Sequence, residues 1–288
     1  MRDVLISELT DAIGFGVAGN FAGHLEQAGE ASDFRSVRSE AADAPKGIFP
    51  WYVPGGETFL GTFPVTSDSL VLPSSQESLR LQIEPEVGVL FAVGYDADGH
   101  VVSLRPTAVG AFNDCSIRRP GATKISEKKN WGPASKGFAT ALFEVSDIDP
   151  AGGLRTLRIA SFLRRGSEVH EYGIDSPAAE YSYCGDRLIS WMLDRLANQV
   201  ASAQTPLEDV GALFREAGRP ERAVVGIGAT RYTDFGERNF LDVGDESLVI
   251  VYDGAVLGRS DVMFAVANRA EFELSGASVL AQQVTATA

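Results

Sequence analysis

Cysteine is scarce in this chain, and the scarcity excludes two common ways of stabilising a fold. Of the 288 residues, only Cys115 and Cys184 are cysteines. Two thiols are too few for a disulfide framework or for a four-ligand structural zinc site. We therefore expect both to be small buried side chains in a protein of a reducing compartment.

Basic residues are also few for a chain of this length. The 25 Lys and Arg residues stand against 39 Asp and Glu residues, which leaves a formal charge of -14. Such a surplus of negative charge repels nucleic-acid phosphates and anionic lipid surfaces. We expect neither nucleic acid nor a membrane to be a partner.

Long apolar segments are missing as well. No segment approaches the roughly 20 apolar residues of a membrane-spanning helix, and Met1-Arg2-Asp3 places an acid where a signal peptide is basic. We therefore predict a cytoplasmic protein. With 44% apolar and 22% charged residues, the composition is that of an ordinary globular protein, which excludes disorder and collagen-like structure.

The apolar periodicity predicts strands, then two helices, then strands. Residues 79–93 alternate as a strand with one buried face and one face that carries acids, and residues 186–203 have helical spacing. Residues 205–218 predict a second helix capped by Thr205 and stopped by Gly218. Residues 223–227 predict a strand and residues 247–257 a hairpin. Without βαβ alternation, this order favours a β-rich α+β fold with a mixed or antiparallel core.

The composition along the chain predicts its division into units. Residues 28–46 are small, polar and charged, which is typical of a linker or a surface excursion. We expect a small N-terminal unit and linker at residues 1–66, a main β-domain at residues 67–277, and a tail at residues 278–288.

The first candidate motif is Gly14-Phe15-Gly16-Val17-Ala18-Gly19, which matches the G-x-G-x-x-G pattern of dinucleotide-binding turns. Such a turn needs an apolar strand directly before it and a second strand that ends in an acid about 20 residues later. The flanking sequence offers neither. We therefore favour a plain glycine-rich turn.

Two acids lie two residues apart in Glu84-Pro85-Glu86. On a strand, such residues point to the same face about 6.5 to 7 Å apart, so both carboxylates project into one space. A solvated polar face and a metal site are both consistent with this spacing. Pro85 removes a ladder donor and so favours an edge or a bulge, and bulges often lie beside active sites.

Asp114 ends another apolar stretch and is the natural third acid. A divalent cation would relieve the repulsion among three carboxylates, and oxygen ligands favour Mg²⁺, Mn²⁺ or Ca²⁺. Taken alone, Asp114 is equally typical of a turn acid that binds nearby backbone amides.

The order of these motifs resembles the fumarylacetoacetate hydrolase superfamily. The resemblance rests on the Glu-x-Glu step, Asp114 followed by Ser-x-Arg, and Lys136-Gly137-Phe138. Further segments agree in order over residues 14–258, namely Asn20-Phe21-Ala22-Gly23-His24, Asp68 to Pro73, and Phe240 to Asp245.

The resemblance implies a β-roll fold with a small N-terminal unit and a helical insertion, assembled as a homodimer. It implies that Glu84, Glu86 and Asp114 hold Mg²⁺ or Mn²⁺, with Ca²⁺ as a further possibility, beside a small anionic oxo-acid substrate. It also implies catalytic roles for His24 and Lys136, and substrate contacts from Arg118, Asn20 and Lys136.

The sequence departs from this family in two places. Relatives commonly place a Glu three residues after the His, where this chain has Gln27, so that Glu30 or a distant acid must replace it. The run Arg119-Pro120-Gly121 replaces an acid and a Gln, which predicts an altered pocket. The basic run at residues 124–131 is consistent with a lid over an anionic substrate or with a solvated loop.

Together these features predict a metal-dependent enzyme that breaks a carbon–carbon bond, by hydrolysis or decarboxylation, in a 2-oxo or 1,3-dicarbonyl acid through an enolate. One alternative keeps the metal and the enolate but catalyses tautomerisation, isomerisation or dehydration. The other is a catalytically silent binding protein of the same fold.

Overall fold

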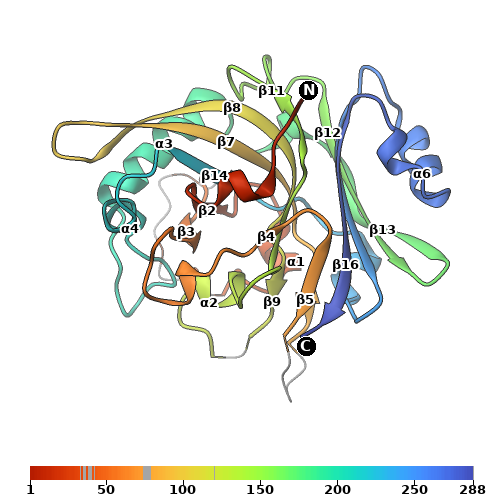
Figure 1. Cartoon of the computed structure of the whole chain (residues 1–288), viewed down its shortest axis with the longest axis horizontal. Helices are drawn as coiled ribbons and strands as arrows, with labels where there is room; N and C mark the ends of the chain where they lie inside the picture. The colour runs from red at the N-terminus through yellow and green to blue at the C-terminus, as the bar shows by residue number, and fades with distance from the viewer. Residues whose placement is uncertain are drawn as a thin grey trace.

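A computed structural model describes residues 1–32, 34, 37, 41, 43–73, 79–119 and 121–287. Within these residues the strands form a nine-stranded sheet, a five-stranded sheet and a two-stranded ribbon, with short helices at the periphery (Figure 1). Pairing in the two large sheets is mostly antiparallel with some parallel pairs. This arrangement confirms the β-rich α+β class that the sequence predicts.

The nine-stranded sheet is built around the long hairpin of β7 and β8, which extends to the left in Figure 1. Its order is β1-β11-β8-β7-β14-β2-β3, with β10 paired to β8 and to β4. The strands are β1 (Arg2–Asp3), β2 (Ile13–Ala18), β3 (Gly47–Tyr52), β4 (Val65–Thr66), β7 (Pro85–Tyr95), β8 (Val101–Asn113), β10 (Lys136–Phe138), β11 (Ala141–Glu144) and β14 (Arg222–Gly226).

The five-stranded sheet has the order β13-β12-β15-β16-β5 and joins segments from both ends of the chain. Its strands are β5 (Ser69–Leu72), β12 (Leu157–Arg165), β13 (Glu168–Pro177), β15 (Glu246–Asp253) and β16 (Ala277–Ala286). The ribbon pairs β6 (Leu81–Gln82) with β9 (Ser116–Ile117).

Short helices lie in the connections between the strands. The α-helices are α1 (His24–Gln27), α2 (Ser126–Lys129), α3 (Gly185–Asn198), α4 (Val210–Glu216), α5 (Asp234–Arg238) and α6 (Arg259–Ala267). The 3₁₀ helices are η1 (Ile6–Leu9), η2 (Phe59–Gly61), η3 (Ala178–Glu180) and η4 (Glu271–Glu273). Helix α3 confirms the predicted amphipathic helix, since it buries Leu188, Trp191, Met192 and Leu196.

The second predicted helix starts later than its sequence signals suggest. Helix α4 begins at Val210 because the carboxylate of Asp209 accepts a hydrogen bond from the amide of Ala212 at 2.8 Å. Thr205, the predicted cap, lies in the preceding turn. Gly218 follows the helix with φ of 77°, as the predicted stop requires.

The predicted hairpin at residues 247–257 is wrong in its second half. Strand β15 is present, but the chain then turns into α6 and does not fold back on itself. The strand that pairs beside β15 is β16, from the end of the chain. Turn signals fix where a strand ends, but not which partner strand it meets.

The predicted tail at residues 278–288 is also wrong. Strand β16 runs through most of it, antiparallel to β15 and parallel to β5. The boundary predicted at residue 66 stays a prediction, although β2 and β3 lie in the same sheet as β7 and β8. Of the predicted linker, residues 33, 35, 36, 38–40 and 42 lie outside the described part of the chain, as does Pro120.

The glycines of the G-x-G-x-x-G match lie mostly in a strand, so the predicted turn is wrong as well. A Cβ on Gly14 would lie 2.2 Å from the ring of Trp51, and one on Gly16 would lie 2.4 Å from the ring of Phe49. These two glycines therefore leave room for aromatic rings of β3 in the core.

Two further expectations concern cysteine and membranes. Both Cys115 and Cys184 are buried free thiols, as predicted. Over the described ranges, no helix combines the length and the apolar character that a membrane crossing needs.

Candidate metal centre

The open end of the β7–β8 hairpin brings together the three acids that the sequence predicts. Pro85 pairs with Asn113, and Glu86 pairs with Phe112. Just beyond this ladder, the amide of Asp114 donates to the carbonyl of Glu84 at 3.0 Å, and the amide of Glu84 donates to the side chain of Asn113 at 3.1 Å. The same ladder that forms the hairpin therefore places Glu84 and Asp114 side by side.

We call Glu84, Glu86 and Asp114 the acid triad. Each offers a carboxylate oxygen that lies within 4.8 Å of the others. Their exposed fractions are 3%, 2% and 0%, so the acidic face of this strand is not the solvated face that the sequence left open. Carboxylates this close and this buried repel one another strongly unless cations or protons compensate them.

Burial and the neighbouring charges shift the pKa values of the three carboxyl groups in different directions. Burial, with the charge of Asp114, raises the pKa of Glu86 well above its ordinary value, and burial also raises the pKa of Asp114. Burial acts in the same direction on Glu84, but the charges of Lys129 and Arg118 outweigh it and hold the pKa of Glu84 below its usual range.

Lys129 is a member of the centre that the sequence analysis missed. Its Nζ lies 2.5 Å from Oε2 of Glu84 and 2.5 Å from Oδ2 of Asp114, and only 2% of the residue is exposed. Although burial opposes it, Asp114 and Glu84 raise the pKa of Lys129. Lys129 is therefore a buried ammonium ion between two carboxylates, so for this residue neither the lid nor the solvated loop is correct.

A signal for Lys129 was present in the sequence. Lys129 follows Ile125 by four residues, which on a helix places both side chains on one face. Ile125 is buried, and α2 directs Lys129 inward with it. Lys128 turns instead toward Glu30, at 3.4 Å.

Lys136 supplies a second buried cation. Its Nζ donates to the carbonyl of Cys115 at 2.7 Å and lies 3.4 Å from Oδ1 of Asp114. Burial lowers the pKa of Lys136, and the ring of Trp131 lies 5.5 Å from its Nζ. The structure thus places this residue of the Lys-Gly-Phe step against the acid triad.

Arg118 is the third cation, and its guanidinium is held by side chains of this chain. Two of its nitrogens donate to Oε1 of Gln82, at 3.0 and 2.6 Å. Its Nη1 lies 2.7 Å from Glu30 and 3.2 Å from Glu84. Glu30, which the sequence offered as a partner for His24, pairs instead with Arg118.

His24 lies in α1 beside the triad, and one of its nitrogens is fixed by the backbone. Its Nδ1 is 2.9 Å from the carbonyl oxygen of Thr230. Because a carbonyl can only accept, Nδ1 carries the proton and Nε2 carries the lone pair. Burial lowers the pKa of His24, so the ring is neutral at neutral pH. Gln27 exchanges two hydrogen bonds with the backbone of Tyr232, at 3.1 and 2.9 Å, and does not orient His24.

Asn20, for which the resemblance implies a substrate contact, makes side-chain hydrogen bonds to the backbone. Its amide nitrogen donates to the carbonyls of Tyr183 and Ile227, at 3.0 and 2.8 Å, and its oxygen accepts from the amide of Tyr183 at 2.8 Å. With its side chain buried and bonded to backbone on two sides, Asn20 joins the segment before α1 to two distant loops.

Two cavities of the centre both have Glu30 in their linings. The inner one, about 20 Å³, has room for a single water molecule or ion and is lined by His24, Lys129 and the acid triad. The outer one, about 440 Å³, has more basic than acidic residues in its lining: Arg80, Arg118, Arg119, Lys128 and Arg238 against Glu30 and Glu237.

The donor set of the inner cavity fits a hard divalent cation. Oε1 of Glu84 and Oδ1 of Asp114 are buried and accept no hydrogen bond from the described residues. Buried carboxylate oxygens without hydrogen bonds are ligands that Mg²⁺, Mn²⁺ and Ca²⁺ prefer. The triad therefore could bind a metal ion, with Lys129 as a competing cation on two of its three carboxylates.

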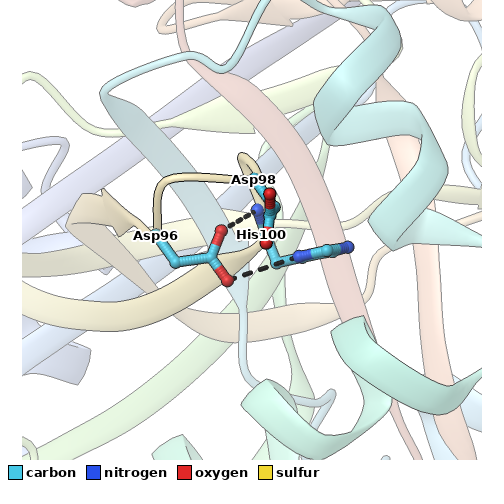
Figure 2. Close-up of side chains that lie close together, drawn as sticks. All are labelled: Asp96, Asp98 and His100. Carbon is cyan, nitrogen blue, oxygen red and sulfur yellow. Dashed lines mark hydrogen bonds and ion pairs between the residues drawn. The ribbon is translucent and has the colours of Figure 1, made fainter.

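A second group with ligand-type spacing lies in the turn between β7 and β8. Figure 2 shows Asp96, Asp98 and His100, which we call the turn cluster. All three are exposed, and Asp96 accepts from the amide of His100 at 2.8 Å and faces its ring nitrogen at 3.3 Å. The His100 amide lowers the pKa of Asp96, as expected for a capped turn in water.

The β-roll, with acids at the open end of its central hairpin, is the fold that the resemblance to the fumarylacetoacetate hydrolase superfamily implies. Three solved structures share it, each over at least 96% of this chain. A candidate HpcE protein from Mycobacterium smegmatis matches at 15% identity and a TM-score of 0.52, over 75% of its own chain. A 2-keto-3-deoxyarabinonate dehydratase matches at 14% identity and a TM-score of 0.52, over 73% of its own chain.

The third structure is 2-keto-3-deoxy-D-arabinonate dehydratase complexed with magnesium and 2,5-dioxopentanoate. It matches at 13% identity and a TM-score of 0.51, over 100% of this chain and 83% of its own. Identities this low establish the fold alone. The chain belongs to DUF5718, a family of unknown function whose model matches residues 30–284. Comparison with curated proteins gave no match.

Proposed function

We propose that this protein is a metal-dependent enzyme that forms an enolate from a small anionic 2-oxo or 1,3-dicarbonyl acid. The acid triad would hold Mg²⁺ or Mn²⁺, and Ca²⁺ would suit the same oxygens. The observation that carries the proposal is the convergence of three buried carboxylates within 4.8 Å on a fold of this superfamily. The magnesium and the dioxo acid bound to one structural neighbour support the same chemistry.

A bound divalent ion supplies Lewis acidity, which lowers the energy of an enolate oxygen. The protein's own residues would supply the proton transfer and further positive charge. The lone pair on Nε2 of His24 makes that nitrogen the acceptor for a proton from substrate carbon or from water. Lys136, buried against Asp114, would add positive charge on the same side of the triad.

The outer cavity supports an anionic substrate. Its lining has more basic than acidic residues, although the chain as a whole carries a charge of -14. A cavity of this sign concentrates small anions near its walls. Because the inner cavity holds only one water or ion, the reacting end of a substrate that enters from the outer cavity would reach the triad after the Glu30–Arg118 pair rearranges.

The bond that reacts separates two candidate activities. Cleavage of a carbon–carbon bond by hydrolysis or decarboxylation is the first, in a cytoplasmic protein that would be a homodimer as the resemblance implies. Isomerisation, tautomerisation or dehydration is the second, and the hydrogen bonds of Gln27 to Tyr232 favour it. Activation of water by His24 is stronger with an acid partner, which Gln27 does not provide.

Deuterium exchange tests the step that both activities share. We would incubate a panel of 2-oxo acids with the protein and Mg²⁺ in D₂O and follow the protons beside the carbonyl by NMR. We expect exchange faster than with Mg²⁺ alone, and its loss in Glu86→Gln but not in Asp98→Asn. Binding of Mn²⁺ without exchange of any acid tested would contradict an enzyme and leave a silent binding protein.

A further inference from the structure

The ammonium of Lys129 lies where the acid triad would hold a metal ion. It contacts two of the three carboxylates at 2.5 Å each, and hydrogen bonds between ionised groups are stronger than those between neutral ones. An ion bound to the same carboxylates would lie within a few ångströms of this nitrogen. Two cations at that separation in a buried site repel one another strongly.

Three cations compensate the carboxylates of the centre without a metal ion. Arg118, Lys129 and Lys136 each lie within ion-pair distance of Glu84 or Asp114, and Arg118 is shared with Glu30. A divalent ion added to this group leaves an excess of buried positive charge. Departure of Lys129 from its carboxylates reduces that excess and at the same time frees the oxygens that the ion needs.

The backbone that carries Lys129 is fixed, but its side chain has several rotatable bonds. The side chain of Asn130 donates to the carbonyls of Trp51 and Thr62, at 2.8 and 3.0 Å, and anchors the end of α2. The four-carbon stem of a lysine has many rotamers, and here its Nζ lies 5.2 Å from the centre of the Phe49 ring. Exchange of the cation therefore needs a change of side-chain rotamer and no movement of the helix.

We propose that Lys129 is the resident cation of this centre and that a divalent ion binds the acid triad only when Lys129 leaves it. This inference rests on the proposed metal site and adds a competitor to it. The apparent affinity for metal is the affinity of the free triad multiplied by the fraction of molecules in which Lys129 has left the triad. It thereby determines the metal concentration at which the centre fills.

Titration of Mn²⁺ into Lys129→Met, by calorimetry and electron paramagnetic resonance, tests the competition. We expect the dissociation constant to fall roughly tenfold or more. This is the change that results if Lys129 occupies the triad in about ten molecules for every one in which it does not. Lys128→Met is the matched control, because it removes the neighbouring ammonium, which pairs with Glu30 and lies outside the triad. Its dissociation constant should stay at the wild-type value.

The outcomes separate this inference from the metal site itself. Tighter binding in Lys129→Met alone supports the inference, and Mn²⁺ binding that appears only in this variant supports it most strongly. Equal or weaker binding in Lys129→Met than in the wild type overturns the inference and leaves the metal site standing. Binding in neither protein overturns both.

A measurement on the wild type keeps the test valid if Lys129→Met does not fold. The ¹⁵Nζ signal of Lys129, assigned through its own side chain, reports the hydrogen bonds of the ammonium during a Mg²⁺ titration. We expect the signal to shift or broaden in step with binding while that of Lys128 does not. An unchanged Lys129 signal at saturating Mg²⁺ would overturn the inference.

Discussion

Two groups of acids lie at opposite ends of the same hairpin, and each meets the spacing of a metal site. The acid triad lies at the open end of β7 and β8, and the turn cluster lies where these strands are joined. The triad is buried, whereas Asp96, Asp98 and His100 are exposed. Spacing alone therefore does not distinguish the two.

The two groups differ in how their negative charge is compensated. In the turn cluster, water and the amide of His100 surround the carboxylate of Asp96. In the triad, water is excluded, and lysine and arginine side chains from other elements supply the compensation. Even so, Oε1 of Glu84 and Oδ1 of Asp114 accept no hydrogen bond among the described residues. Burial, together with carboxylate oxygens that face cations but accept no hydrogen bond among the described residues, distinguishes a candidate metal centre from a capped turn.

The largest difference should appear in stability. Asp114→Asn removes the carboxylate that faces both Lys129 and Lys136, and breaking a buried ion pair in this way costs about 3–5 kcal/mol. Asp98→Asn at the turn should change the free energy of unfolding by about 0.5 kcal/mol or less. Urea denaturation measures both, and equal losses would mean that the buried charges are not coupled as described.

The second-largest difference between the two groups should appear in metal affinity. Glu86→Gln removes one ligand of the triad, and we expect Mn²⁺ binding to weaken at least as much as after loss of an outer-shell partner, roughly 10–100-fold. Asp98→Asn should leave the affinity unchanged. Calorimetry on both variants provides the measurement. If Asp98→Asn weakens binding and Glu86→Gln does not, the ion binds at the turn.

The smallest effect should appear in how stability depends on pH, through His24. Burial holds the pKa of His24 below its ordinary 6.5, so the unfolded chain takes up this proton before the folded one does. Stability should therefore fall as pH drops through about 6.5, and His24→Asn should flatten that slope. Denaturation between pH 5 and 8 measures it, and an unaltered slope in His24→Asn would contradict burial of the neutral ring.

The acid triad was predictable because its geometry is local. Glu84 and Glu86 share a strand face by alternation, and Asp114 follows the strand that pairs with theirs. The resemblance to the family was also visible in the sequence, because it depends on the order of short motifs along the chain. The outcome confirms the fold, and the triad does converge as predicted.

The remaining parts of the centre depend on tertiary contacts that spacing does not encode. Lys129 belongs to a basic run with the composition of a solvated loop, and only the packing of α2 buries it. Arg118 binds Glu30, and Asn20 binds the backbone of Tyr183, from segments far away in the chain. Strand β16 resembled a tail because its pairing partners are likewise distant.

The convergence of Glu84, Glu86 and Asp114 on one cation is tested most directly by a crystal structure of the protein with Mn²⁺, located by its anomalous scattering. We predict a single ion bound by oxygens of these three residues, with Nζ of Lys129 moved away from Glu84 and Asp114. Manganese at Asp96, Asp98 and His100, or none at the buried acids at saturating concentration, would contradict it.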